Sequence, residues 1–159
     1  MGLIRAMLEQ CRQRKCLLVG IGNILQSDDG FGPYVIENLR GKTSVSLLDG
    51  GSSPENMLGP ILKISPDELI IVDTLCLDAP VGTLHWVEPD ELENVGISTH
   101  APSLDIFVSY IKQHNYDTRI HIIGVVPAQI TFGEDISRKV RQSAEELIVI
   151  ISNIFPAPP

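Results

Sequence analysis

The stretch CLLVGIGNILQSDDGFG, residues 16–32, joins a short apolar run to a glycine-rich loop that ends in two adjacent aspartates. The run Cys16–Ile21 is almost wholly apolar, which is typical of a parallel strand covered on both faces. Apolar residues then follow a helical spacing at Phe31, Val35 and Leu39. A buried strand, a glycine loop and a helix in this order predict the first unit of an α/β fold.

The rest of the chain alternates between further apolar runs and segments of helical spacing. Strands are predicted over residues 45–48, 69–72, 83–87 and 120–126, and helices over 28–41, 54–62, 98–113 and 131–154. Only nine residues, 74–82, connect the third strand and its closing Asp73 to the fourth strand. A parallel crossover needs about a dozen residues, so the fourth strand is predicted to run antiparallel. The pattern predicts an α/β three-layer sandwich, with helices on both faces of a twisted, mostly parallel, five-stranded sheet.

Local capping signals mark the starts of the last two predicted helices. Ser98 or Thr99 is expected to cap the helix that runs to about residue 113. Thr131 and Glu134 resemble a capping box, which predicts that the final helix begins there.

The length of the chain, 159 residues, predicts one domain, 1–159, that buries roughly 70% of the surface its unfolded form exposes. Residues 1–15 are interpreted as an N-terminal extension. The proline-rich end FPAPP, residues 155–159, cannot continue a helix and is expected to be frayed.

The charge balance excludes several classes of partner. Twenty acidic residues against twelve basic ones give a formal net charge of −8, without a basic footprint for a phosphate backbone. No apolar run approaches the roughly 20 residues of a membrane span, and residues 1–10 lack the apolar centre of a signal peptide. Neither nucleic acid nor membrane insertion is therefore expected, and the location is predicted to be cytoplasmic.

Three cysteines, Cys11, Cys16 and Cys76, form no C-x-x-C pair. An odd number without that spacing argues against a disulfide framework and against a zinc knuckle. They are interpreted as reduced, structural thiols.

The glycine loop resembles a dinucleotide fingerprint but departs from it in two ways. Leu25 stands where the third glycine belongs, and Asp28 and Asp29 place negative charge where a pyrophosphate would lie. No nucleotide cofactor is therefore expected, and a cation is favoured. Ligands of doubly wound sheets sit at the carboxyl ends of the strands where the strand order reverses, so these aspartates and Asp73 are predicted to share one crevice. Alternatively, either Asp28 or Asp29 caps the first helix instead of binding a cation.

A divalent cation needs a further ligand, and four histidines are candidates. His85, His114 and His121 lie within predicted strands or at a helix end and are interpreted as structural or solvated. His100 lies at the start of a predicted helix, beside the crevice. Two carboxylates and an imidazole suit zinc, nickel and similar metals.

Four motifs in collinear order resemble the hydrogenase maturation endopeptidases. They are GIGN-x-L-x-x-DDG-x-G at 20–32, DGGSSPEN at 49–56, LIIVD at 69–73 and STH at 98–100. The resemblance covers roughly residues 17–151 and is most similar to the branch that processes hydrogenase 3-type large subunits.

This resemblance implies an endopeptidase that removes a short C-terminal extension from the nickel-loaded large-subunit precursor of a [NiFe] hydrogenase. It assigns the metal-contacting and catalytic roles to Asp29, Asp73 and His100. It also assigns the substrate loop to the segment Asp49, Gly50 and Gly51. Some members carry glutamate where Asp29 stands, which implies a slightly shorter reach toward the metal here.

The mechanism is narrowed by what the sequence lacks. It has no G-x-S-x-G elbow and no evident base for Cys76, so nucleophilic acyl transfer has no visible apparatus. The segments after Asp49 and Asp73 do not form the symmetric pair of a retroviral-type aspartic dyad. Metal-assisted hydrolysis remains, with Asp29 or Asp73 as the base and with nickel supplied by the substrate.

Two other functions stay open at this stage. A metal-sensing assembly module that does not cut would not obviously need a complete peptidase pattern. A nucleoside- or nucleotide-processing α/β enzyme conflicts with the acidic loop tip.

Overall fold

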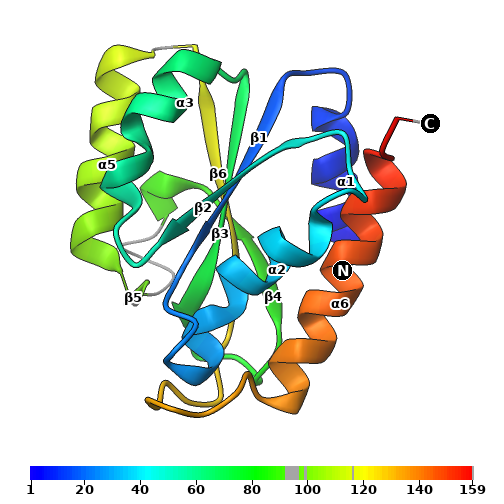
Figure 1. The fold of residues 1–159 in the computed structure, drawn as a ribbon, viewed down its shortest axis with the longest axis vertical. Coiled ribbons are helices and arrows are strands. Elements are labelled where there is room, and N and C mark those ends of the chain that lie inside the picture. Colours follow the sequence, from blue (N-terminus) through cyan, green and yellow to red (C-terminus); the bar gives the residue numbers. More distant parts are fainter. Residues whose placement is uncertain (92–96, 99, 116, 159) are drawn as a thin grey trace.

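The computed structural model describes the chain except residues 92–96, 99, 116 and 159. Its sheet has the strand order β2-β1-β3-β6-β4 (Figure 1). The strands are β1 (Cys16–Ile21), β2 (Ser46–Gly51), β3 (Glu68–Cys76), β4 (Leu84–Val87) and β6 (Arg119–Val125). β1, β2, β3 and β6 are parallel, and β4 pairs antiparallel with β6 at the edge. The predicted sheet, with its antiparallel fourth strand outside the β1–β3 pair, is confirmed.

Helices cover both faces of the sheet, as the alternating pattern predicted. On one face lie α1 (Gly2–Cys11), α2 (Phe31–Leu39) and α6 (Arg138–Ile154); on the other lie α3 (Leu58–Ile64) and α5 (Ala101–His114). Short 3₁₀ helices, η1 (Ser27–Gly30), η2 (Pro54–Met57) and η3 (Pro89–Glu91), complete the connections. No helix of the described residues has the length and apolar character that a membrane crossing requires.

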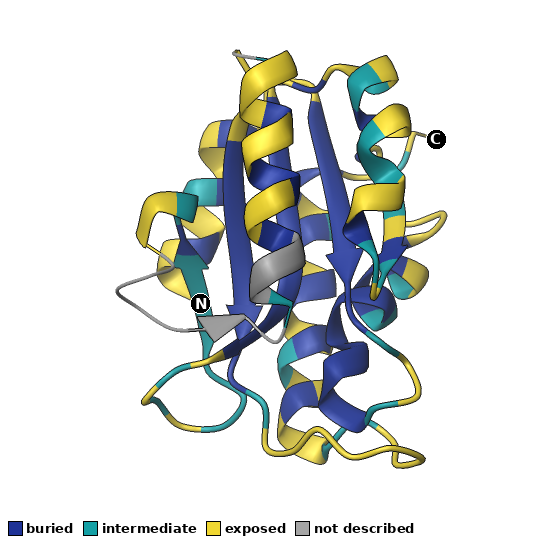
Figure 2. Cartoon of the chain, turned by 90° about the vertical axis from the view of Figure 1, so that its left-hand side faces the viewer, coloured by how far each residue is buried: buried dark blue, intermediate teal, exposed yellow. Residues whose placement is uncertain are grey.

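The core consists of two apolar clusters separated by the sheet. Leu18 and Val72 pack with α1, α2 and α6, whereas Leu17, Val19 and Ile71 pack with α3 and α5. Neighbouring strand residues thus face opposite layers, and the central strands are buried on both faces (Figure 2). Burial on both faces explains why these strands appear in the sequence as continuous apolar runs.

A backbone contact places the start of α2 against the carboxyl ends of two central strands. A Cβ atom on Gly32 would lie 2.3 Å from the Ile21 carbonyl oxygen and 2.4 Å from that of Val72. Only a residue without a side chain fits at this distance. The contact fixes η1, which directly precedes α2, next to the carboxyl ends of β1 and β3.

A small strand, β5 (Ile97–Ser98), was not predicted from the sequence. It pairs antiparallel with the end of β3, through Leu75↔Ser98 and Cys76↔Ile97. Ser98, one of the two expected caps, lies in β5, so that alternative is wrong; the other, Thr99, lies outside the described residues, and the N-cap of α5 is His100. The pairing places Ser98, two residues before His100, beside the end of β3.

The predicted start of the final helix is wrong. α6 begins at Arg138 with Ser137 as its N-cap, not at the supposed capping box near 131–134. The segment before it folds back toward the first loop, where the Gly133 N–H donates to the Leu25 carbonyl at 2.9 Å. This tertiary contact explains why the residues before Arg138 do not continue the helix.

The two ends of the chain are also more ordered than the sequence suggested. The extension contains α1, whose Ile4, Leu8 and Cys11 are buried. At the other end Phe155 is buried, and its carbonyl oxygen accepts hydrogen bonds from the Ser44 N–H and the Thr43 hydroxyl. The expectation of a frayed tail is wrong for this residue because its ring belongs to the core.

We expect Gly32→Ala to lower the free energy of unfolding by about 2 kcal/mol, because the added methyl group overlaps two backbone carbonyls. The matched control is Gly59→Ala in α3, where a Cβ atom would meet nothing within 4 Å. That control should raise the free energy of unfolding by about 0.5–1 kcal/mol, since alanine has a higher helix propensity than glycine. Urea unfolding measures both changes, and equal stability of the two variants would contradict the packing described.

Candidate functional site

Two carboxylates and an imidazole meet at the carboxyl edge of the sheet. Asp29 lies on η1 after β1, Asp73 lies near the end of β3, and His100 immediately precedes α5. His100 Nε2 is 3.6 Å from Asp29 Oδ2, and His100 Nδ1 is 3.4 Å from Asp73 Oδ1. The structure therefore brings together all three residues that the sequence singled out.

Neighbouring groups hold both carboxylates in place. Asp29 accepts a hydrogen bond from the Asn23 N–H at 2.9 Å, and its other oxygen lies 3.4 Å from the Thr74 hydroxyl. Asp73 Oδ1 accepts from the Thr74 N–H at 2.7 Å. Sequence analysis missed Asn23 and Thr74 as supporting residues; the position of Thr74 directly after Asp73 was the only local signal.

Burial gives this cluster strong electrostatic coupling. Asp29 is 2% exposed and Asp73 0%, whereas the His100 side chain is 13% exposed. The hydrogen bond with Asp73 raises the pKa of His100 above its ordinary value of 6.5, against the opposing effect of burial. The negative charges of Asp73 and Asp29 raise it further.

The chemistry of these groups fits a divalent cation. Metal–oxygen and metal–nitrogen bonds of about 2.0–2.2 Å place ligand atoms about 3.3–3.6 Å apart in a tetrahedron, close to the distances between His100 and the two carboxylates. One cation can use only one nitrogen of the ring, however, and here each nitrogen faces a different carboxylate. Coordination of one cation by Asp29, Asp73 and His100 together therefore requires the imidazole or one of the carboxylates to turn.

Asp28 has a structural position instead. It is 0% exposed, and it accepts hydrogen bonds from the Ala128 N–H at 2.7 Å, the Ser137 N–H at 2.6 Å and the Ser137 hydroxyl at 2.9 Å. Neither η1 nor α2 has a side-chain cap, so the alternative that an aspartate caps the first helix is wrong. Asp28 instead fastens η1 to the segment before α6. Its partners lie about a hundred residues away, beyond the reach of local sequence signals.

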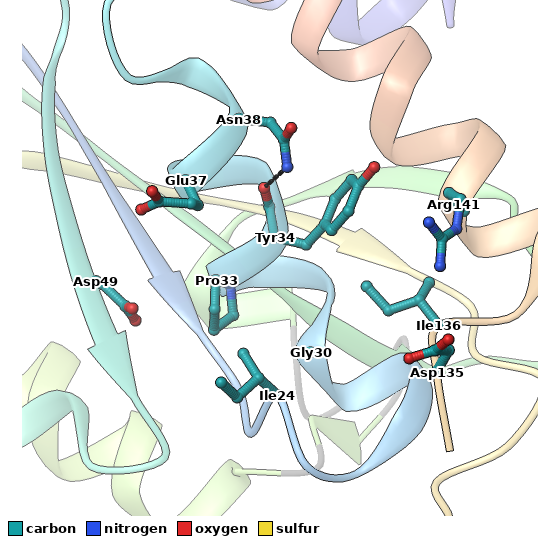
Figure 3. Close-up of a pocket in the computed structure, with 10 residues that line it drawn as sticks. All are labelled: Ile24, Gly30, Pro33, Tyr34, Glu37, Asn38, Asp49, Asp135, Ile136 and Arg141. Carbon is teal, nitrogen blue, oxygen red and sulfur yellow. Dashed lines mark hydrogen bonds between the residues drawn. The ribbon is translucent and has the colours of Figure 1, made fainter. Parts of the chain in front are cut away.

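The DGG segment lies beside the site rather than within the cluster. Asp49 is exposed, and its side chain accepts a hydrogen bond from the Gly51 N–H at 2.9 Å. The Gly51 carbonyl accepts from the Gly22 N–H at 2.8 Å, which ties this segment to the loop after β1. Asp49 also lines a cavity of about 510 Å³ together with Tyr34 and Arg141 (Figure 3).

Fold and site together define an α/β protein with a cation-compatible carboxylate–imidazole cluster where the strand order reverses. A family model for hydrogenase maturation proteases matches residues 33–154. A putative hydrogenase maturation protease of Methanocaldococcus jannaschii is 30% identical, covering 93% of this chain and 91% of that protein. The hydrogenase 3 maturation protease of Escherichia coli is 26% identical, covering 81% and 83%.

The structural comparison agrees with the sequence comparison. The crystal structure of the [NiFe] hydrogenase maturation protease HycI from Thermococcus kodakarensis superposes with a TM-score of 0.83 at 30% identity, covering 93% of this chain and 97% of that one. The chain belongs to the hydrogenase maturation protease family, whose members are peptide hydrolases.

We expect an NMR titration of the metal-free protein to give His100 a pKa above 6.5, and Asp73→Asn to lower it. A raised folded-state pKa means that the pair stabilises the fold fully below pH 6.5 and loses this contribution as pH rises through the folded pKa. The stability difference between wild type and Asp73→Asn should therefore shrink above that pKa. A His100 titration that Asp73→Asn leaves unchanged would contradict the coupling.

Proposed function

We propose that this protein is the endopeptidase that removes the C-terminal extension from the nickel-loaded large-subunit precursor of a [NiFe] hydrogenase. Membership of the family supports the reaction class, and relatives named as hydrogenase 3 maturation proteases support the substrate class. The observation that carries the proposal is the cluster of Asp29, Asp73 and His100, in which the His100 side chain is 13% exposed. We assign the reaction to the cytoplasm.

The residues of the chain would divide the work of metal-assisted hydrolysis. Asp29, Asp73 and His100 would hold a divalent cation, which when bound would supply polarisation of the scissile carbonyl and greater acidity of an attacking water. Asp29 or Asp73, each held by backbone N–H donors, accepts the proton of that water. The segment Asp49–Gly51 binds the precursor beside the cleavage point, where the cavity next to η1 offers room for a peptide.

We further propose that the nickel of the precursor is the productive metal. In the structure both nitrogens of His100 face carboxylates, so the imidazole bridges Asp29 and Asp73. Nickel brought in by the substrate would turn the ring and gather all three ligands around one ion. Three protein ligands leave a coordination position for a group of the precursor. Cleavage would then depend on prior nickel insertion, because the ion itself positions the scissile bond.

Incubation with nickel-loaded precursor and mass analysis of the product test the site assignment. We expect Asp29→Asn, Asp73→Asn and His100→Ala each to slow release of the C-terminal extension by at least about 100-fold, because each removes a ligand or base. Cys76→Ser is the control, since this exposed thiol should contribute little. Circular dichroism shows whether the variants remain folded. An inactive Cys76→Ser beside an active His100→Ala would refute the assignment.

The source of the metal is tested by treating the enzyme with a chelator, removing the chelator, and adding precursor with or without nickel. We expect the treated enzyme to cut the loaded precursor at an unchanged rate and to leave the nickel-free precursor intact. If the treated enzyme fails on loaded precursor and zinc restores it, a resident catalytic metal operates instead. If the nickel-loaded precursor binds but neither the chelator-treated nor the untreated enzyme cleaves it, the protein senses nickel without cleaving.

A further inference from the structure

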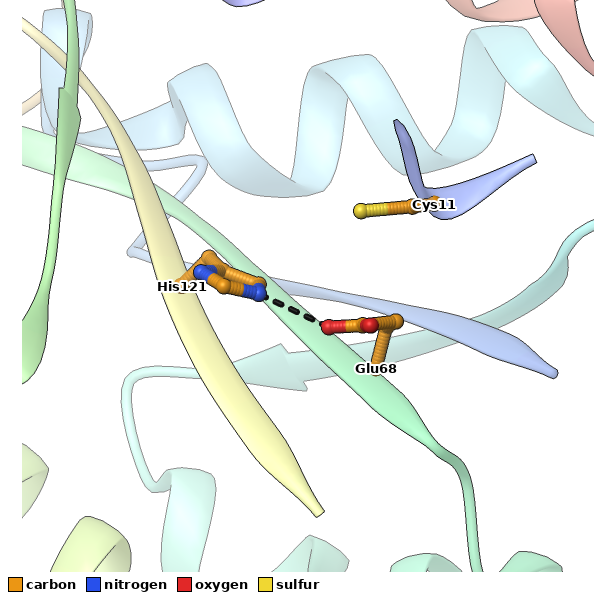
Figure 4. A group of neighbouring side chains, drawn as sticks. All are labelled: Cys11, Glu68 and His121. Atoms are coloured by element: carbon orange, nitrogen blue, oxygen red, sulfur yellow. Dashed lines mark hydrogen bonds and ion pairs between the residues drawn. The ribbon is translucent and has the colours of Figure 1, made fainter. Parts of the chain in front are cut away.

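A second group of potential metal ligands lies at the opposite edge of the sheet (Figure 4). Cys11 ends α1, Glu68 begins β3, and His121 lies near the start of β6. One ligand atom from each residue lies within 4.8 Å of those of the other two. Glu68 and Asp73 are five residues apart on one strand, about 16 Å, so this cluster is separate from the site described above.

His121 is oriented as metal-binding histidines usually are. Its Nδ1 lies 2.9 and 3.1 Å from the two carboxylate oxygens of Glu88, and its Nε2 lies 2.8 Å from Glu68 Oε2. A neutral imidazole has a single N–H. When that N–H is donated to Glu88, the lone pair of Nε2 faces a carboxylate oxygen at 2.8 Å, and a cation that both atoms bind as neighbouring ligands would offset the repulsion between them. A carboxylate behind a coordinating histidine is the recurrent arrangement that fixes its tautomer.

Glu68 can coordinate a cation without leaving its present partners. The residue is 1% exposed, and its Oε1 accepts from Arg119 and lies 3.4 Å from Arg14 Nε. Its other oxygen, Oε2, faces His121. The carboxylate therefore has one oxygen for the arginines and one for a metal. About half of each arginine side chain is exposed, so both can adjust.

Cys11 completes the set with a thiol, the softest of the three ligands. It is buried at 5% exposure and borders a cavity of about 220 Å³ that Glu68 and His121 also line. This cavity offers a path for an ion. The Cys11 thiol donates to the Met7 carbonyl at 3.4 Å, and coordination of a cation by the thiolate would replace this hydrogen bond. Cys16 itself donates to the Cys11 carbonyl at 3.2 Å.

We propose that Cys11, Glu68 and His121 form a second metal site, which takes a borderline divalent cation of the zinc class. Sulfur, oxygen and nitrogen ligands in one tetrahedron suit zinc, and the fourth position remains for water. Ligand atoms around zinc lie about 3.3–3.8 Å apart, so the more distant atoms need to approach by at most about 1.5 Å, and His121 Nε2 and Glu68 Oε2, now 2.8 Å apart, need to separate by about 0.5–1 Å. The bound ion would fasten the end of α1 to β3 and β6. Sequence analysis had interpreted Cys11 as a structural thiol and His121 as structural or solvated, and only the tertiary structure brings them next to Glu68.

Cobalt titration tests the proposal, since Co²⁺ occupies zinc sites and gives a thiolate charge-transfer absorption. We expect the full-length protein to bind one equivalent with this absorption. Cys11→Ser should abolish the absorption, and His121→Gln should weaken binding at least about tenfold. Zinc should displace the cobalt. Cys76→Ser and His100→Ala are the controls, because both leave the proposed ligands in place, and both should retain the absorption.

Two results would overturn the proposal. One is a wild-type protein that binds no cobalt with thiolate absorption, which would leave Glu68, His121 and Glu88 as a metal-free ion-pair network. The other is an absorption that survives Cys11→Ser or disappears in Cys76→Ser. If Cys11→Ser does not fold, as judged by circular dichroism, His121→Gln decides the question, and unchanged affinity refutes the site. The readout does not involve peptide cleavage, so its outcome is independent of the proposed reaction.

Discussion

The parallel pairing of β1 with β3 is the constraint on which both polar clusters depend. The strands are in register from Cys16↔Glu68 to Gly20↔Val72, and both are buried on each face. Parallel strands that begin side by side at one end of a sheet also end side by side at the other end. The loop after β1 and the end of β3 are therefore neighbours, and so are their starting residues. The two clusters lie at opposite ends of the same pair of strands.

The two adjacent aspartates show how burial gives similar side chains different tasks. The Asp28 carboxylate accepts hydrogen bonds from N–H and hydroxyl donors, which compensate its charge. These bonds connect η1 to the start of α6. Asp29 instead faces the imidazole of His100, with its Oδ2 at 3.6 Å from Nε2. The tie formed by Asp28 holds η1 in place, so the position of Asp29 depends on it.

The two clusters also differ in the ions that their ligand chemistry favours. Asp29, Asp73 and His100 present oxygen and nitrogen, which suit zinc, nickel and similar metals. Cys11, Glu68 and His121 add a thiol, a ligand that zinc-class ions favour. Both clusters are largely buried, and they lie about 16 Å apart along β3.

The sequence by itself determined the α/β class, the antiparallel fourth strand and the three residues that meet at the carboxyl edge. The first two followed from local patterns, which are continuous apolar runs and a connection of nine residues. Local pattern also placed Asp28, Asp29 and Asp73 after strands, and the resemblance to the maturation endopeptidases selected Asp29, Asp73 and His100. Only the tertiary structure decided the role of Asp28, the start of α6, the pairing of β5 and the grouping of Cys11 with Glu68 and His121. These features join residues far apart in the chain, and contacts of that kind form only when the sheet and its two helical layers pack together.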